Sequence, residues 1–416
     1  MPARQLLVIA DDLTGGADAG VRFARAGLPT RLLIDPAAAG LDGDLAGALV
    51  VDTDSRQLPP EVARRAVRTA ARMVRAGHLF KKVDSLLRGP LAAELAGLRD
   101  ALPGTLVVLA PALPAAGRTT VDGVQHLDGT ALHHTSAWAA EPRPPARDIA
   151  AQLAPIELTR IGLAEVRDRR LAMAIDAAAT PVVLCDAATD ADLASIVHTG
   201  LAARRPICWA GTAGLAGALA GALTLTSPPV ANGTVAELTG AYRDAAGGPY
   251  LAVVGSATPA ALAQAEELAS RGAQLLSIPA EQLVAGGGDL AARISRTAAR
   301  ADTVVRVEGG VDPAAAGRVA AALAAVTAPA AAHAHLLVLT GGATARAVLT
   351  GAGVSSLWLL AEPEPGVVVS AEPATGRLIV TKAGSFGGRD ALSRAVAAVR
   401  RTPSPAHRDA PKEPTA

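Results

Sequence analysis

Residues 6–18 read Leu-Leu-Val-Ile-Ala-Asp-Asp-Leu-Thr-Gly-Gly-Ala-Asp, five apolar residues followed directly by two carboxylates and a glycine-containing stretch. The apolar run predicts a buried strand, and the glycines mark the start of a helix. Acidic side chains at the carboxyl end of a parallel strand lie where open α/β sheets bind ligands. Asp11 and Asp12 are therefore candidate site residues. The alternative is that Asp12 or Thr14 only caps the helix.

Short apolar runs rich in β-branched residues recur along the chain, each followed by a turn and an amphipathic stretch. This alternation predicts an α/β fold, with two α/β domains and largely parallel sheets. Turn signals cluster near the middle of the chain and prolines near its end, so we expect domains at residues 1–230 and 249–401, a linker at 231–248 and a disordered tail at 402–416. The runs are residues 6–10, 48–51, 106–109, 182–185, 207–210, 251–254, 274–278, 303–307 and 336–339.

The composition excludes several classes of protein. Half of the 416 residues are hydrophobic, and 39 Lys and Arg against 38 Asp and Glu leave a formal net charge of +1, which excludes a wholly disordered chain. Without a basic excess, and with 2% aromatic residues, the chain is not expected to bind nucleic acid.

The cellular location follows from apolar segments and cysteines. Residues 207–236 carry no charge, but their Ala, Gly and Thr content favours a buried strand, a helix and a linker over a membrane span. The first apolar run is too short for an export signal. Cys185 and Cys208 indicate buried thiols in a reducing compartment. We expect a cytoplasmic protein without a membrane partner, and the sequence leaves a homo-oligomer open.

Charged residues also follow the second apolar run. Residues 52–56 read Asp-Thr-Asp-Ser-Arg, which brings Arg56 toward the same sheet edge as Asp11 and Asp12. An arginine there can hold a carboxylate through two parallel hydrogen bonds. The alternative is a solvated loop arginine.

Two further stretches of the first half combine charges with rigid turns. Residues 80–90 read Phe-Lys-Lys-Val-Asp-Ser-Leu-Leu-Arg-Gly-Pro. Asp84 is suited to accept a proton from a substrate hydroxyl, and Lys82 and Arg88 to hold an acid group; the alternative is a turn closed by an Asp84–Arg88 salt bridge. Residues 110–123 contain two prolines before a Gly-Arg-Thr-Thr turn, and Arg118 in that turn is a second candidate anion contact.

In the second half, residues 253–259 and 339–345 both run from a strand through small residues into a helix. Backbone N–H groups at such helix starts favour phosphate. Lys382 and the following Gly384 are suited to face a nucleotide, because glycine lets the backbone approach a ligand closely. The sequence contains neither a P-loop motif nor a dinucleotide-binding fingerprint, so any nucleotide site uses another design.

Taken in this order, the motifs resemble those of the four-carbon acid sugar kinase family, the former domain of unknown function 1537, over nearly the whole chain. The resemblance implies an N-terminal sugar-acid-binding domain, a C-terminal nucleotide-binding domain, and an active site in the cleft between them. Members phosphorylate the terminal (4-) hydroxyl of erythronate, threonate or 3-oxo-tetronate with ATP and Mg²⁺. The matching blocks are residues 10–20, 52–58, 81–89, 111–128, 255–259, 341–345, 364–366 and 382–388.

The resemblance assigns roles by matching position. It leaves Asp84 or Asp12 as the general base, and no metal ligand is assigned. Ala343 stands where the family usually has an acid, which implies weaker magnesium or ribose binding, and Leu86 replaces a threonine. For the sugar acid, the resemblance implies contacts with Asp12, Arg56, Lys82, Asp84 and Ser85, and the residue patterns add Asp11, Arg88 and Arg118. For ATP, the resemblance implies contacts with Ser256, Gly341, Gly342, Ala343, Thr344 and Gly384, and the residue patterns add Lys382.

Two other functions stay open on the sequence. A magnesium-dependent phosphatase would use Asp11 or Asp12, but it leaves the glycine loops of the second half unexplained. A non-catalytic sensor of sugar acids or nucleotides is suggested by Ala343. ATP binding distinguishes the kinase from the phosphatase, and turnover distinguishes it from the sensor.

Overall fold

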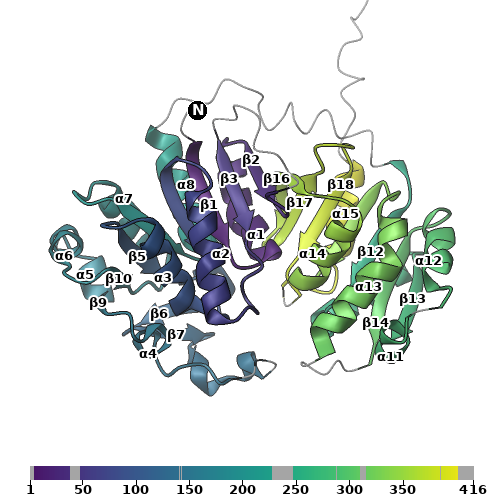
Figure 1. The fold of residues 1–416 in the computed structure, drawn as a ribbon, viewed down its shortest axis with the longest axis horizontal. Coiled ribbons are helices and arrows are strands. Elements are labelled where there is room, and N and C mark those ends of the chain that lie inside the picture. Colours follow the sequence, from purple (N-terminus) through teal and green to yellow (C-terminus); the bar gives the residue numbers. More distant parts are fainter. Residues whose placement is uncertain are drawn as a thin grey trace, which may run out of the picture. The chain divides into compact units, whose positions relative to one another are not determined.

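The computed structural model describes residues 4–37, 47–139, 141, 143–226, 247–286, 288–309, 315–384 and 386–401. The chain divides into two compact α/β units (Figure 1). The first comprises Met1–Asn232 with Asp312–Ala316 and Ser355–Leu359, and the second comprises Gly233–Val311, Gly317–Val354 and Leu360–Ala416. Most of the expected linker and the whole expected tail lie outside the described residues.

The first unit is built on a parallel sheet with the strand order β2-β3-β1-β4-β11-β5-β10-β9. The first residues of β16 (Ser356–Glu364) pair antiparallel with β2 at one edge. All five runs predicted in this half form strands, whereas β2, β4 and β9 lie outside those runs. The parallel strands are β1 (Arg4–Ala10), β2 (Thr30–Leu33), β3 (Ala48–Asp52), β4 (Ala76–Lys82), β5 (Leu106–Ala110), β9 (Leu158–Ile161), β10 (Val182–Cys185) and β11 (Ile207–Gly211).

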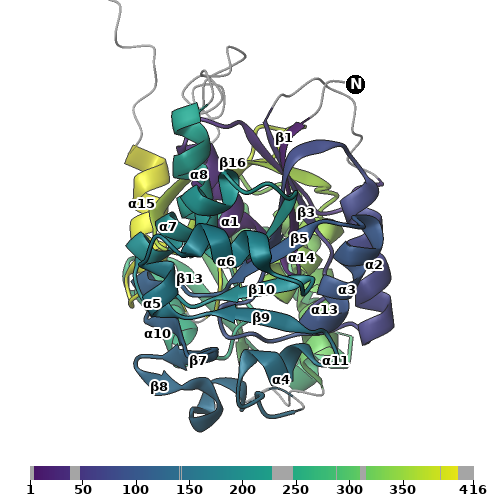
Figure 2. The ribbon, with the colours of Figure 1, turned by 90° about the vertical axis from the view of Figure 1, so that its left-hand side faces the viewer.

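Helices cover both faces of this sheet (Figure 2). Helices α1 (Leu13–Arg25), α7 (Asp190–Leu201) and α8 (Ala213–Thr226) pack together on one face, and α2 (Pro60–Arg72) packs on α3 (Leu91–Ala101) on the other. Strands buried on both faces need apolar residues at successive positions, which is why the sequence shows continuous apolar runs rather than alternation. Shorter elements are α4 (Ile149–Leu153), α5 (Leu163–Val166), α6 (Leu171–Ala177), the antiparallel sheet of β6 (Arg118–Val121), β7 (Val124–Leu127) and β8 (Thr130–Ala131), and the 3₁₀ turns η1 (Pro114–Ala116), η2 (Leu132–His134) and η3 (Ser136–Trp138).

The direction of the connections reverses between β1 and β4. From β1 the chain passes through α1 to β2, toward one edge of the sheet. From β4 it passes through α3 to β5, toward the opposite edge. Ligands of open α/β sheets bind outside the carboxyl ends of strands at such a reversal. The segments that follow β1 and β4 are those in which the sequence places Asp11, Asp12 and Asp84.

The second unit repeats this arrangement with the parallel order β13-β14-β12-β15-β18 and the reversal at β12 and β15. Strand β17 (Val367–Ala371) pairs antiparallel with β18. The four predicted runs correspond to β12–β15, and the strands after them were not predicted. The elements are β12 (Tyr250–Val254), β13 (Gln274–Pro279), β14 (Thr303–Glu308), β15 (Leu336–Thr340), β18 (Leu378–Lys382), α10 (Pro259–Ser270), α11 (Ala280–Val284), α12 (Leu290–Ala298), α13 (Ala316–Ala331), α14 (Gly342–Gly351) and α15 (Ala391–Arg401).

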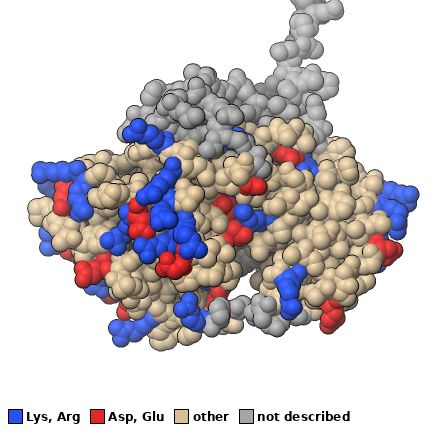
Figure 3. Space-filling view, in the orientation of Figure 1, with Lys and Arg blue, Asp and Glu red and all other residues tan. Residues whose placement is uncertain are grey.

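Charged side chains of both signs gather on the surface over α2 and α3 (Figure 3). Arg64 on α2 forms an ion pair of 2.7 Å with Asp100 on α3, and both side chains are partly exposed. Exposed pairs of this kind contribute about 0–1 kcal/mol to stability. In the described part of the chain, no helix combines the length and the apolar character needed to cross a membrane.

Candidate functional site

Arg56 joins the carboxylates that follow β1. Its Nε donates to Asp11 Oδ2 at 2.7 Å and its Nη2 to Asp12 Oδ1 at 2.7 Å. Nη2 also lies 3.5 Å from Asp84 Oδ1. The parallel register of β1 with β3 and β4 ends these three strands at one level, so the side chains that follow them meet. Only 16% of the Arg56 side chain is exposed, and the alternative of a solvated loop arginine is wrong.

Asp12 has two structural roles. Its Oδ1 accepts from the backbone N of Gly15 at 2.9 Å, which caps α1. Its Oδ2 accepts from Thr14 Oγ1 at 2.8 Å. Asp12 therefore does cap the helix, but capping is not its whole role, because the same carboxylate also belongs to the Arg56 cluster.

Asp84 is held by Arg88 as well as by Arg56. Arg88 Nε and Nη2 donate to the two Asp84 oxygens at 2.8 Å each. The backbone N groups of Leu86 and Arg88 point to Oδ2 as well, at 3.3 and 3.1 Å. Burial opposes the ionisation of Asp84, but Arg56, Arg88 and Lys82 outweigh it and hold the pKa of this carboxyl far below its usual range. The salt-bridged turn foreseen as the alternative is present, within the cluster.

Other predicted contacts surround these acids. The Lys82 ammonium is buried, donates to Val83 O at 2.8 Å, and lies 3.0 Å from where a Cβ on Gly15 would stand. Ser85 follows Asp84 in the same turn. Arg118 at the start of β6 donates to Ala116 O; burial lowers the pKa of its guanidinium, and the charges of Asp128 and Asp84 oppose that shift.

Sequence reasoning missed the buried layer beneath the cluster. Lys81 Nζ lies 3.0 Å from Glu94 Oε2, and Glu94 Oε1 accepts from Ser55 Oγ next to Arg56. Burial raises the pKa of Glu94, and the positive charge of Lys81 opposes this shift. A signal existed: adjacent residues of a strand point to opposite faces, so Lys81 and Lys82 lie on opposite faces of a helix-covered sheet, and a buried cation on each face needs a partner.

In the second unit the loops after β12, β15 and β18 come together. Gly255 lies so close to α14 that an added Cβ would overlap the Thr344 side chain, with Cβ–Cβ at 2.6 Å. Gly341 before α14 has φ +95°, a conformation that favours glycine. Thr258 Oγ1 donates to Gly384 O at 2.9 Å, and Ser256 Oγ lies 3.2 Å from Thr258 Oγ1.

The remaining nucleotide candidates differ in exposure. Gly342 and the exposed Ala343 form the first turn of α14, so backbone N–H groups at that helix start are available to an anion. Lys382 is buried, and its ammonium donates to Ala383 O at 2.7 Å, Gly384 O at 3.3 Å and Phe386 O at 2.9 Å. Burial lowers the pKa of Lys382 to about 8. Lys382 thus faces the loop that carries Gly384.

The chain matches two domain families along its length. Residues 6–219 match the sugar-binding N-terminal domain, and residues 251–392 match the nucleotide-binding C-terminal domain. A D-threonate kinase of Cupriavidus necator is 36% identical, with 96% of this chain and 99% of the relative covered. A 3-oxo-tetronate kinase of Methylobacterium radiotolerans is 29% identical, with 93% and 97% covered.

The chain belongs to the four-carbon acid sugar kinase family. Membership makes it a phosphotransferase that acts on a sugar-acid hydroxyl, which favours the kinase over the phosphatase and the sensor. The fold agrees: a solved Salmonella typhimurium protein has a TM-score of 0.74 at 19% identity, with 94% of this chain and 98% of that chain covered. A Haemophilus influenzae protein of the former domain of unknown function 1537 has a TM-score of 0.66 at 20% identity, with the same coverage.

Proposed function

We propose that this kinase transfers the γ-phosphoryl group of ATP to the terminal (4-) hydroxyl of a four-carbon sugar acid, with threonate the first candidate, then erythronate and 3-oxo-tetronate. One observation carries the proposal: Arg56 joins Asp11 and Asp12 at the strand reversal of the unit that matches the sugar-binding domain. Three full-length relatives named D-threonate kinase, at 30–36% identity, support the choice of acid.

The cluster offers complementary groups to such an acid. Arg56, Lys82, Arg88 and Arg118 supply cations for the substrate carboxylate, and the aspartates supply acceptors for its hydroxyls. Oδ1 of Asp11 is buried and has no hydrogen-bond partner among the described residues, so one acceptor of the cluster is unused. Phosphoryl transfer depends mainly on positioning and charge stabilisation, so a crowded set of fixed charges suits it.

We propose Asp12 rather than Asp84 as the base. A general base works best when its pKa lies near the working pH. The pKa of Asp84 is held far below that range by Arg56 and Arg88, so Asp84 is a poor proton acceptor and better suited to orient the two guanidinium groups.

ATP is proposed to bind the second unit, where the loops at Ser256, Gly341 to Thr344 and Gly384 meet. Magnesium would accompany the nucleotide and neutralise phosphate charge. We assign no side chain to the ion: within the described residues, no three His, Cys, Asp or Glu side chains are grouped to hold a metal. We place the protein in the cytoplasm, which the free, buried thiols of Cys185 and Cys208 support.

The test is incubation with magnesium-ATP and each stereoisomer of threonate, erythronate and 3-oxo-tetronate. Mass spectrometry should detect ADP and one phosphorylated acid, and ³¹P coupling to the terminal CH₂ should locate the phosphate on the 4-hydroxyl. Arg56→Met should abolish acid binding by calorimetry while ATP binding remains. ATP binding without any phosphorylated acid would overturn the proposed substrate class.

A further inference from the structure

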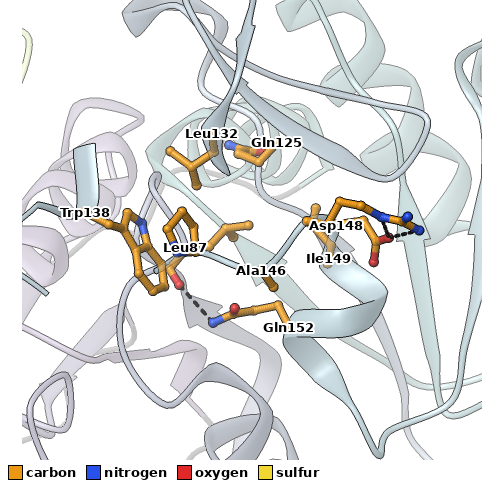
Figure 4. Close-up of a pocket in the computed structure, with 10 residues that line it drawn as sticks. Leu87, Gln125, Leu132, Trp138, Ala146, Asp148, Ile149 and Gln152 are labelled. Carbon is orange, nitrogen blue, oxygen red and sulfur yellow. Dashed lines mark hydrogen bonds and ion pairs between the residues drawn. The ribbon is translucent and has the colours of Figure 1, made fainter. Parts of the chain in front are cut away.

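Three side chains hold three consecutive backbone carbonyls of the loop that carries Asp84 and Arg88. Gln125 Nε2 donates to Ser85 O at 3.0 Å, Trp138 Nε1 to Leu86 O at 2.7 Å, and Gln152 Nε2 to Leu87 O at 3.3 Å. The donors come from β7, η3 and α4, and with Leu87 they line one pocket (Figure 4). We call Gln125, Trp138 and Gln152 the carbonyl clamp.

Two donors of the clamp, Gln125 and Gln152, are held by further contacts, and Trp138 packs partly buried against the hydrophobic core. Gln125 is buried, and its Oε1 accepts from Thr120 Oγ1 at 2.8 Å, which directs its amide nitrogen to the loop and also to Pro111 O at 3.2 Å. Helix α4, which carries Gln152, is capped by Asp148 and anchored by Ile149 and Leu153 in the hydrophobic core that also contains Leu87. The clamp is therefore connected to the hydrophobic core of the first unit.

The loop needs such support. Leu87 has φ +58°, a left-handed conformation that is unfavourable for a residue with a side chain. That conformation places the backbone N groups of Leu86 and Arg88 on Asp84 and brings the Arg88 guanidinium back over the same carboxylate. If the loop relaxed, Asp84 and Arg88 would lose their fixed positions together.

We propose that the carbonyl clamp is a set of positioning residues that holds the 84–88 loop ready for the sugar acid. Gln125, Trp138 and Gln152 hold backbone carbonyls and act only through Asp84 and Arg88. The inference rests on the proposed function for its substrate. It predicts that losing one clamp donor weakens the binding of the acid and leaves the binding of ATP unchanged.

The first variant is Trp138→Phe, which keeps an aromatic ring and removes the N–H donor. A single neutral hydrogen bond contributes about 1 kcal/mol, so we expect the KM for the acid to rise about five- to tenfold, with the KM for ATP within about twofold of wild type. A general loss of folded protein would instead lower the apparent kcat and leave both KM values unchanged. Trp358→Phe is the matched control, because Trp358 lies on β16, on the far side of β2 and β3 from β1.

A second variant guards against misfolding of the first. Gln152 is partly exposed, and Gln152→Glu replaces its N–H donor by a carboxylate facing Leu87 O. Amide hydrogen exchange of residues 84–88 should then rise in both clamp variants and not in Trp358→Phe. The proposal would be overturned if Trp138→Phe and Gln152→Glu had the same KM for the acid as Trp358→Phe. Unchanged amide exchange in the loop would overturn it as well. A wild-type protein without turnover but with faster loop exchange in both variants would overturn the proposed function instead.

Discussion

The ammonium of Lys81 and the carboxylate of Glu94 lie 3.0 Å apart with 0% and 4% of their side chains exposed. The pair is linked to the cluster through the Arg56 loop. Glu94 also accepts from Ser55 Oγ, and the backbone N of the next residue, Arg56, donates to Asp11 O at 3.2 Å. A fully buried pair is costly to desolvate, so its presence is weak support for stability. Its contacts instead tie the Arg56 loop to β4 and α3.

Replacing one member of this pair should destabilise the protein more than replacing both members. Lys81→Met leaves the Glu94 charge buried without its partner, and the free energy of unfolding should fall by about 3–5 kcal/mol. The double variant Lys81→Met/Glu94→Met should recover most of that loss. Urea unfolding measures the free energy of unfolding of the single and the double variant. Arg64→Met, at the exposed Arg64–Asp100 pair, is the control and should cost no more than about 1 kcal/mol. A double variant as unstable as the single one would contradict this account.

The sequence was informative where local pattern determines structure. Apolar runs predicted β1, β3, β5, β10 and β11 of the first sheet but not the central strand β4. The parallel register of β1 with β3 and β4 brought Asp11, Asp12, Arg56 and Asp84 together. The pairing of the first residues of β16 with β2 was missed because the two segments lie more than 300 residues apart, as in the pair Ser356 and Leu33, and such long-range pairing has no local signal.

The missed site residues share one physical reason. Gln125, Trp138 and Gln152 act through single N–H groups on backbone carbonyls, and any loop glutamine or tryptophan offers the same donor. Their role depends on three elements that meet only in the folded unit. Glu94 likewise sits in an ordinary helix, and only its burial beside Lys81 distinguishes it.

Asp12 and Asp84 should respond differently to replacement by asparagine. Asparagine caps a helix as well as aspartate does, so Asp12→Asn should preserve α1 and, as the loss of a base, lower kcat about 10²- to 10⁴-fold. Asp84→Asn removes the charge that orients Arg56 and Arg88, and should mainly raise the KM for the acid. Steady-state kinetics on both substrates distinguishes the two. Equal losses of kcat in both variants would remove Asp12 from its proposed role.

Lys382 should make ATP binding sensitive to pH. Burial lowers the pKa of Lys382 to about 8, so the ammonium loses its charge as the pH rises through about 8. A neutral amine has two N–H groups for the three carbonyls that the ammonium holds, and the loop at Gly384 should loosen. We expect the KM for ATP to rise between pH 7 and pH 9 while the KM for the acid stays flat. Lys382→Arg, which does not titrate in this range, should remove the dependence.

Gly255 tests the packing of the nucleotide loops. In Gly255→Ala the new methyl group overlaps the Thr344 side chain, whose Cβ would be 2.6 Å away, so the β12 loop or α14 must shift. A shift at the proposed phosphate site should raise the KM for ATP at least tenfold, while calorimetric binding of the sugar acid stays unchanged.

Gly221→Ala on α8 provides the matched control for this substitution. No atom lies within 4 Å of the added Cβ there, and alanine in a helix interior should stabilise the protein by about 0.5–1 kcal/mol without changing either KM. If Gly255→Ala bound ATP as tightly as Gly221→Ala, the close approach of Gly255 to Thr344 would be unrelated to nucleotide binding. If Gly255→Ala weakened the binding of the sugar acid as much as the binding of ATP, the substitution would have disturbed the whole chain rather than the nucleotide loops.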